Sequence, residues 1–169
     1  MNIALLPTVP LTFAFAAALL LFPDAVADPD PPAADEPLDG MVFAGRIGPA
    51  DDPDLADHLY FENGRFWSAQ CVRCGFEPGV YWVRRTAGGI AFRGVLESAD
   101  RGTFTYEGMV RGGRVDVSIH WRHERWYWTI DRDLRFVGEI VEGEAAGMTL
   151  EQARALAGGS EPRPDRCPS

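Results

Sequence analysis

Residues 80–97 read VYWVRRTAGGIAFRGVLE, and this stretch contains the pattern that decides the fold. Two segments rich in β-branched and aromatic residues, Val80–Thr86 and Ile90–Glu97, flank the small residues 87–89. Glycine pairs accept the positive φ angles that tight hairpin turns require. The stretch therefore predicts a β-hairpin.

The same pattern recurs along the chain. Asn63-Gly64 separates residues 59–61 from Phe66-Trp67, and Arg111–Gly113 separates two further apolar segments. Strands are expected at about 41–48, 58–61, 65–70, 80–86, 89–97, 103–110, 114–121, 126–130 and 134–140. Sequential hairpins favour an all-β fold, an antiparallel up-and-down meander of about eight strands that closes into a small barrel, over a Greek key.

Alternation within the strands predicts which side chains face inward. Phe92 and Leu96 share one face, while Arg93 and Glu97 lie on the other. A period of two with one apolar face is typical of a sheet that is packed on one side and wet on the other. Three glycines fall on or near the inward register, where a missing side chain permits bending or close approach: Gly94, Gly108 and Gly138.

The first 27 residues have the features of an export signal. Leu11–Phe22 is an uninterrupted apolar run, and Ala25–Ala27 supplies the small-x-small pattern at which signal peptidase cleaves. The alternative is an uncleaved membrane anchor over Ile3–Phe22, although two prolines and the early end of the run disfavour a span. We therefore expect a periplasmic or secreted protein with no membrane span after signal cleavage.

The mature chain is long enough for one domain. Residues 28–40, rich in Pro and Asp, are expected to be a disordered acidic spacer, and residues 41–142 the barrel domain. Residues 143–169 are expected to form a tail with one short helix near 150–157, because Thr149 and Gln152 match a capping box.

Acidic residues dominate the segment before the barrel. The net charge is −9, yet residues 28–58 hold nine acidic side chains and one arginine. The remaining barrel sequence has no dense basic stripe, which excludes nucleic acid as a partner. The acidic residues of 49–57 lack the glycine and glutamate of an EF-hand loop, so we expect a solvated acidic loop there.

Three cysteines are present: Cys71, Cys74 and Cys167. In an oxidising compartment the first expectation is a structural disulfide, which either joins Cys71 to Cys74 or tethers the tail through Cys167. The tether is slightly favoured because it closes the longer loop. Redox chemistry and a zinc site are the weaker alternatives. His120 and His123 form a weak His-x-x-His signal, and we expect no metal and no cofactor.

The aromatic residues are the best indication of function. Trp126-Tyr127-Trp128 is expected to place rings on both faces of one strand. The first hypothesis is a non-catalytic binding module for a small apolar or amphipathic ligand inside the barrel or at its mouth. The expected lining residues are Trp82, Phe92, Tyr106, Trp121 and Trp128. The alternative is an envelope interaction protein, or an inhibitor of a secreted hydrolase, that acts through exposed loops. An enzyme is the weakest hypothesis, because no catalytic grouping emerges.

A scattered family resemblance supports the same fold and compartment. The run LYFENGRFWSAQC at 59–71 resembles small exported bacterial proteins with lipocalin-like barrels, together with Gly75-Phe76, Tyr81, Gly102-Thr103, Gly108 and Tyr127-Trp128. The resemblance covers roughly residues 58–130. It implies a barrel and export, and it implies no catalytic residues.

Overall fold

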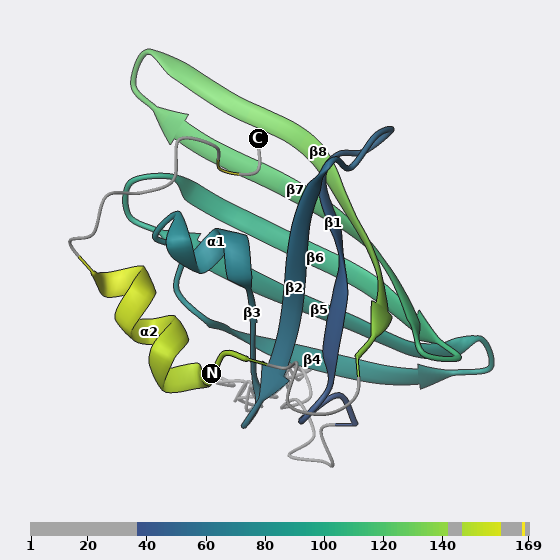
Figure 1. Ribbon diagram of the computed structural model, residues 1–169. Coiled ribbons are helices and arrows are strands. Elements are labelled where there is room, and N and C mark those ends of the chain that lie inside the picture. The colour runs from purple at the N-terminus through teal and green to yellow at the C-terminus, as the bar shows by residue number, and fades with distance from the viewer. Residues whose placement is uncertain (1–36, 142–146, 160–166, 168–169) are drawn as a thin grey trace, which may run out of the picture. The chain divides into compact units, whose positions relative to one another are not determined.

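A computed structural model describes residues 37–141, 147–159 and 167, and confirms an antiparallel β-barrel (Figure 1). The expected signal segment 1–27, residues 28–36 of the expected spacer and most of the tail beyond 159 lie outside the described residues. The strands are β1 (Val42–Pro49), β2 (Leu55–Glu62), β3 (Arg65–Ser68), β4 (Gly79–Thr86), β5 (Gly89–Ser98), β6 (Gly102–Arg111), β7 (Arg114–Arg125) and β8 (Trp128–Ile140). The helices are α1 (Ala69–Arg73) and α2 (Leu150–Gly158).

Each strand pairs with the next in the chain, and β8 pairs with β1 to close the barrel. This is the predicted up-and-down meander. Two of the turns use the expected left-handed backbone, with φ of 51° and 70° at Asn63 and Gly64, and 54° and 81° at Gly112 and Gly113. Such angles match the twist of the flanking strands.

The structure corrects the expected elements at two places. Strand β3 ends at Ser68 instead of residue 70, because the Ser68 side chain caps the short helix α1 by accepting from the Cys71 backbone N–H. Residues 126–130 are not a separate strand. Trp126 and Tyr127 form the turn between β7 and β8, and residues 128–130 belong to β8 together with the expected strand at 134–140.

The spacer also ends earlier than expected. Residues 37–40 form an ordered turn in which Leu38 is fully buried in the main core. The Asp39 carboxylate accepts hydrogen bonds from the Tyr81 hydroxyl, at 2.7 Å, and from the Gly64 backbone N–H. The burial of Leu38 and the hydrogen bonds of Asp39 hold residues 37–40 against the barrel.

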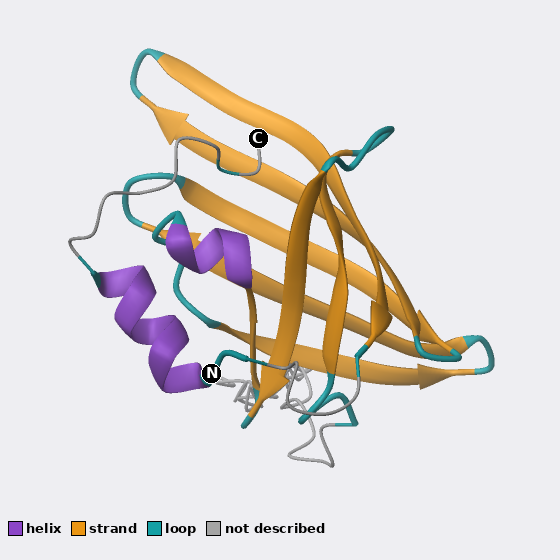
Figure 2. Ribbon diagram, in the orientation of Figure 1, coloured by secondary structure: helices purple, strands orange, loops and turns teal. Residues whose placement is uncertain are grey.

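A second apolar layer covers the outer face of the first strands. Val42, Tyr60 and Trp67 point away from the barrel interior and pack with Ala153 and Ala157 of α2. Helix α2 begins with the predicted capping box, in which Thr149 and Gln152 bond each other's backbone N–H. Figure 2 shows α1 and α2 next to each other beside these strands. Among the described residues, no helix is both long and apolar enough to cross a membrane.

Candidate functional site

The barrel interior is the first place expected to bind a ligand. Phe92, Tyr106 and Trp121, three of the five predicted lining residues, are buried in the main core cluster, as the alternation of their strands requires. Their rings contact other aromatic rings. Phe66 lies 5.2 Å from Tyr106 and Phe104 lies 5.6 Å from Trp121, measured between centroids.

Inward-facing glycines make room for these rings. A Cβ atom on Gly94 would stand 2.3 Å from the Phe66 ring, and one on Gly108 would stand 2.2 Å from the Phe92 ring. A Cβ atom on Gly138 would likewise stand 2.8 Å from the Phe136 ring. The Phe66 and Phe92 rings therefore lie directly on the backbone of other strands, the Phe136 ring lies on its own strand, and the centre of the barrel is packed with the protein's own side chains.

The other two predicted lining residues lie elsewhere. Trp82 is 42% exposed on the outer face of β4, because the inward positions beside it belong to Tyr81 and Val83. Trp128 is 37% exposed and lies at the far end of the β7–β8 hairpin, beside His123. The expectation that all five residues line one site is therefore corrected.

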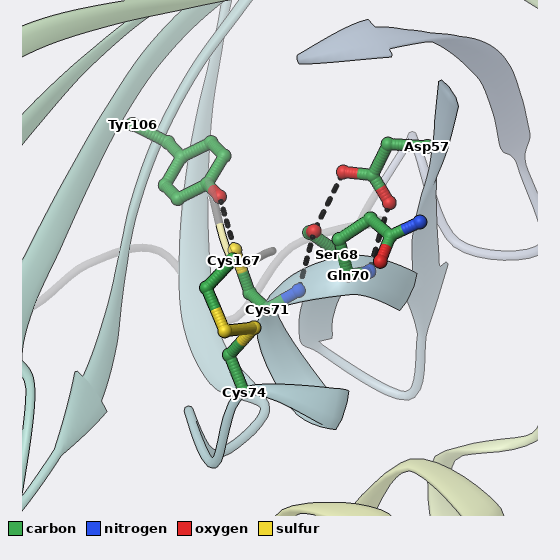
Figure 3. Close-up of a disulfide and its surroundings, with 7 residues drawn as sticks. All are labelled: Asp57, Ser68, Gln70, Cys71, Cys74, Tyr106 and Cys167. Atoms are coloured by element: carbon green, nitrogen blue, oxygen red, sulfur yellow. Dashed lines mark hydrogen bonds between the residues drawn. A yellow bond between two sulfur atoms is a disulfide. The ribbon is translucent and has the colours of Figure 1, made fainter. Parts of the chain in front are cut away.

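A buried polar cluster joins helix α1 to the barrel (Figure 3). The Asp57 carboxylate accepts from the Ser68 hydroxyl at 2.6 Å and from the backbone N–H groups of His58 and Gln70. The Cys71 thiol lies 3.2 Å from the Tyr106 hydroxyl, in the barrel core. Asp57 thus belongs to β2 and is buried, in contrast to the solvated acidic loop expected for residues 49–57.

The cysteines are used as one disulfide and one buried thiol. Cys74 is bonded to Cys167, 93 residues away, which confirms the predicted tether of the tail (Figure 3). Cys71 is free and buried, and burial raises the pKa of its thiol to about 12. Because the thiolate is the reactive form, this thiol is unsuited to redox catalysis. Cys71 lies in helix α1 and Cys74 directly follows the helix, where a strand end was expected.

Asp57 gives a testable pH dependence. Burial raises the pKa of this carboxyl from 3.8 to about 6, although its hydrogen bonds act in the opposite direction. Because the folded protein binds this proton more tightly than the unfolded chain does, protonation of Asp57 stabilises the fold below pH 4. This contribution is lost as the pH rises through 6. We expect the unfolding free energy of the native protein, relative to Asp57→Asn, to fall by about 2 kcal/mol between pH 4 and pH 7.

Urea unfolding of both proteins at the two pH values measures this difference directly. The comparison with Asp57→Asn cancels the titration of the other carboxylates. One of these is Asp116, whose pKa is lowered by its hydrogen bonds to Arg135. A difference that does not change with pH would contradict the buried position of Asp57.

His120 and His123 both lie in β7, which runs to Arg125 instead of ending at residue 121. His120 is exposed between two carboxylates, with nitrogen–oxygen distances of 3.5 Å to Asp131 and 3.0 Å to Asp133. His123 is buried against Trp128. No group of three or more ligating side chains in the described part of the chain is arranged to hold a metal ion.

Cross-strand ion pairs cover the outer face of the long strands. Arg93 pairs with Glu107, Arg114 with Glu139, and Arg135 with Asp116. Because these pairs are exposed, each contributes little to stability.

The β7–β8 hairpin extends beyond the rest of the barrel (Figure 1). The pairing of β8 with β1 starts at Leu134, and the pairing of β7 with β6 ends at Arg122. Residues 123–133 therefore form a ribbon in which the two strands pair with each other beyond their neighbours. The Arg125 guanidinium donates to the backbone oxygen of Asp100, which ties the ribbon to the β5–β6 turn.

Aromatic side chains occupy the tip of this ribbon. Trp126 is 93% exposed and Tyr127 is 65% exposed, and their ring centroids lie 4.8 Å apart. The Trp128 ring follows at 6.0 Å from that of Tyr127. We define these three residues as the aromatic tip. Sequence reasoning singled out the triplet and placed it on a strand; the structure places the first two residues in the turn, where both rings reach solvent.

Comparisons with known proteins give no relative for this chain. No family model matches it, and no curated protein or solved structure is similar to it at a significant level.

Proposed function

We propose that the protein is an exported, non-catalytic binding module that engages a protein partner through the aromatic tip. The observation that carries the proposal is the contrast between the two aromatic sets. The rings inside the barrel pack on one another and on glycines, while Trp126 and Tyr127 stand in solvent. A filled interior favours the partner-binding hypothesis over a ligand held inside the barrel.

The chemistry of the tip fits a protein surface. Trp, Tyr and Arg are the residues enriched among those that dominate the affinity of protein interfaces. The tip contributes two tryptophans and a tyrosine, with Arg125 immediately before them. The bond from Arg125 to Asp100 holds the ribbon in place, which reduces the entropy lost on binding.

Export and the absence of catalysis are further parts of the proposal. The apolar run before Ala25–Ala27 supports export, and so does the Cys74–Cys167 disulfide, since such bonds persist in oxidising compartments. The high pKa of the buried Cys71 thiol supports a role without covalent chemistry. An envelope protein is the partner class that these features favour, and a secreted hydrolase that the protein inhibits is the alternative.

Photocrosslinking in the cells that make the protein identifies the partner. Benzoylphenylalanine at position 127 is expected to give one predominant adduct, and the same residue at Arg84, an exposed position on β4, is expected to give none. With the partner purified, Trp126→Ala is expected to weaken binding at least tenfold, because truncation of an exposed aromatic anchor costs more than about 1.4 kcal/mol at a hot spot.

Trp82→Ala is the matched control. Trp82 is also an exposed tryptophan, yet it lies on the outer face of β4, away from the aromatic tip. Both variants should unfold at the same denaturant concentration as the native protein. Equal affinity of Trp82→Ala and Trp126→Ala for the partner would contradict the proposal, as would an adduct from position 84 with the same protein.

A further inference from the structure

Two adjoining hollows open on the outer face of the strands β4–β8 and β1, each with a volume of about 800 Å³. They share Met109, Arg111 and Asp116 and therefore form one continuous groove, which we call the outer groove. A volume of this size is in the range of sites that hold small molecules. No residue of the aromatic tip lines the outer groove, so the two surfaces are separate.

The floor of the outer groove is apolar and reaches solvent. Ala91 and Met109 are directly opposite each other on β5 and β6, and both are half-buried, as is Val137 on β8. The short Ala91 side chain lies opposite the much longer Arg84, which leaves a depression between the two strands. Trp82 precedes Arg84 by two residues on the same face of β4 and is 42% exposed. An apolar contact surface is therefore open to a bound molecule.

The charged side chains around the outer groove do not balance. Five arginines and three acidic residues line it, a net charge of +2, whereas the whole chain carries −9. Each acidic residue pairs with an arginine of its own: Glu107 with Arg93, Glu139 with Arg114, and Asp116 with Arg135. In the described part of the chain, Arg84 and Arg111 have no acidic partner.

These two arginines stand on either side of the apolar floor. Arg84 lies across from Ala91 on β4, and Arg111 follows Met109 by two residues on β6. The Arg111 Nε donates to the Gly88 backbone oxygen at 2.8 Å, which holds its side chain beside the β4–β5 turn. Guanidinium groups bind the oxygens of carboxylate, sulfate and phosphate groups through several N–H donors. An anionic group between Arg84 and Arg111 would leave the rest of its molecule on the apolar floor.

We propose that the outer groove binds a small amphipathic anion, whose charged group pairs with Arg84 and Arg111 and whose apolar body contacts Met109 and Trp82. The sequence predicts a small apolar or amphipathic ligand with Trp82 among its contacts. The outer groove retains this ligand class and this contact, adds a negative charge to the ligand, and moves the site from the barrel interior to the outer face. The inference does not depend on the proposed role of the aromatic tip.

Anilinonaphthalene sulfonate is a suitable probe, because it joins a sulfonate to aromatic rings and becomes more fluorescent in apolar surroundings. We expect saturable binding of one equivalent to the folded protein. N-phenylnaphthylamine has the same rings without the sulfonate, and should bind at least tenfold more weakly because it forms no ion pair. Sodium chloride at about 0.5 M should weaken binding of the sulfonate, since salt screens exposed charges.

Arginine variants test the charged half of the site. Arg84→Gln should weaken binding of the sulfonate about fivefold, the upper part of the range for one exposed ion pair. Arg111→Gln should have a similar effect. Arg154→Gln is the matched control, because it removes the same charge from an exposed position on α2 that does not line the outer groove, and it should leave the affinity unchanged.

Tryptophan variants test the apolar half. Trp82→Ala should weaken binding of the sulfonate at least threefold, because it removes apolar contact area, whereas Trp126→Ala should leave it unchanged. The protein partner of the aromatic tip is expected to show the opposite pattern, so failure of one proposal is distinguishable from failure of the other. Absence of binding, equal affinity for the two dyes, or binding that Trp126→Ala abolishes and Trp82→Ala preserves would overturn the inference.

Discussion

Gly108→Ala is expected to lower the free energy of unfolding by about 3 kcal/mol, the upper part of the range for overpacking a core. The added methyl group would stand 2.2 Å from the nearest atom of the Phe92 ring. That ring has little freedom to move, because Phe61 and Phe66 lie 5.2 and 6.4 Å from it by centroid. Denaturant unfolding followed by near-UV circular dichroism measures the loss.

A matched glycine and a compensating change test the stated cause. Gly158→Ala adds the same methyl group where no atom lies within 4 Å, and its stability should stay within about 1 kcal/mol of the native value. Phe92→Leu removes the opposing ring and should recover part of the loss when combined with Gly108→Ala. Equal stability of the two glycine variants would show that the interior is not packed against β6.

Removal of the Cys74–Cys167 bond is expected to have the largest effect on stability. The bond joins residues that are 93 apart in sequence. Closing a loop of that length restricts the unfolded chain by about 4.6 kcal/mol in the chain-entropy treatment, an upper limit for what is observed. The unfolding free energy should therefore drop by several kcal/mol when Cys167 is replaced.

The measurement compares Cys71→Ala with Cys71→Ala/Cys167→Ser. The shared Cys71→Ala background prevents a new bond between Cys71 and Cys74 from forming in the variant. A reducing agent should lower the stability of Cys71→Ala to that of the double variant and leave the double variant unchanged. Two unfolding curves that coincide without reductant would contradict a structural role for the bond.

The hairpins could be predicted because their signals are local. Asn63-Gly64 and Gly112-Gly113 require a left-handed backbone, and the structure has it at all four residues. Alternation then fixes the buried face of each strand, as at Phe92. Each of the eight strands pairs with the next one in the chain. Only the free edges of β1 and β8 are then left, and these two strands pair to close the barrel.

The β7–β8 turn could not be predicted from these rules. Trp126 and Tyr127 have no positive φ angle and belong to residue types that favour strands. The sequence around them therefore gives no turn signal. Helix α1 was missed for a related reason, because five residues are too few to show helical periodicity. Its signal is the capping side chain of Ser68, which is common outside helices too.

The candidate sites depend on contacts that the sequence does not encode locally. Trp82 follows and precedes apolar residues, so alternation does not assign its face, and the pairing of β4 with β5 places it outside. Alternation predicts Tyr60 and Trp67 as strand residues, and only helix α2, about 90 residues later, buries them on the outer face of the barrel. Such long-range packing requires the folded structure.

A crystal structure of the protein purified from its own compartment tests the central claim most directly. It should show Phe66 lying on Gly94 and Phe92 on Gly108, no foreign molecule among them, and Trp126 and Tyr127 projecting from the end of the ribbon. Electron density for a bound molecule between Phe66, Phe92 and Tyr106, with these rings displaced from the glycines, would contradict it.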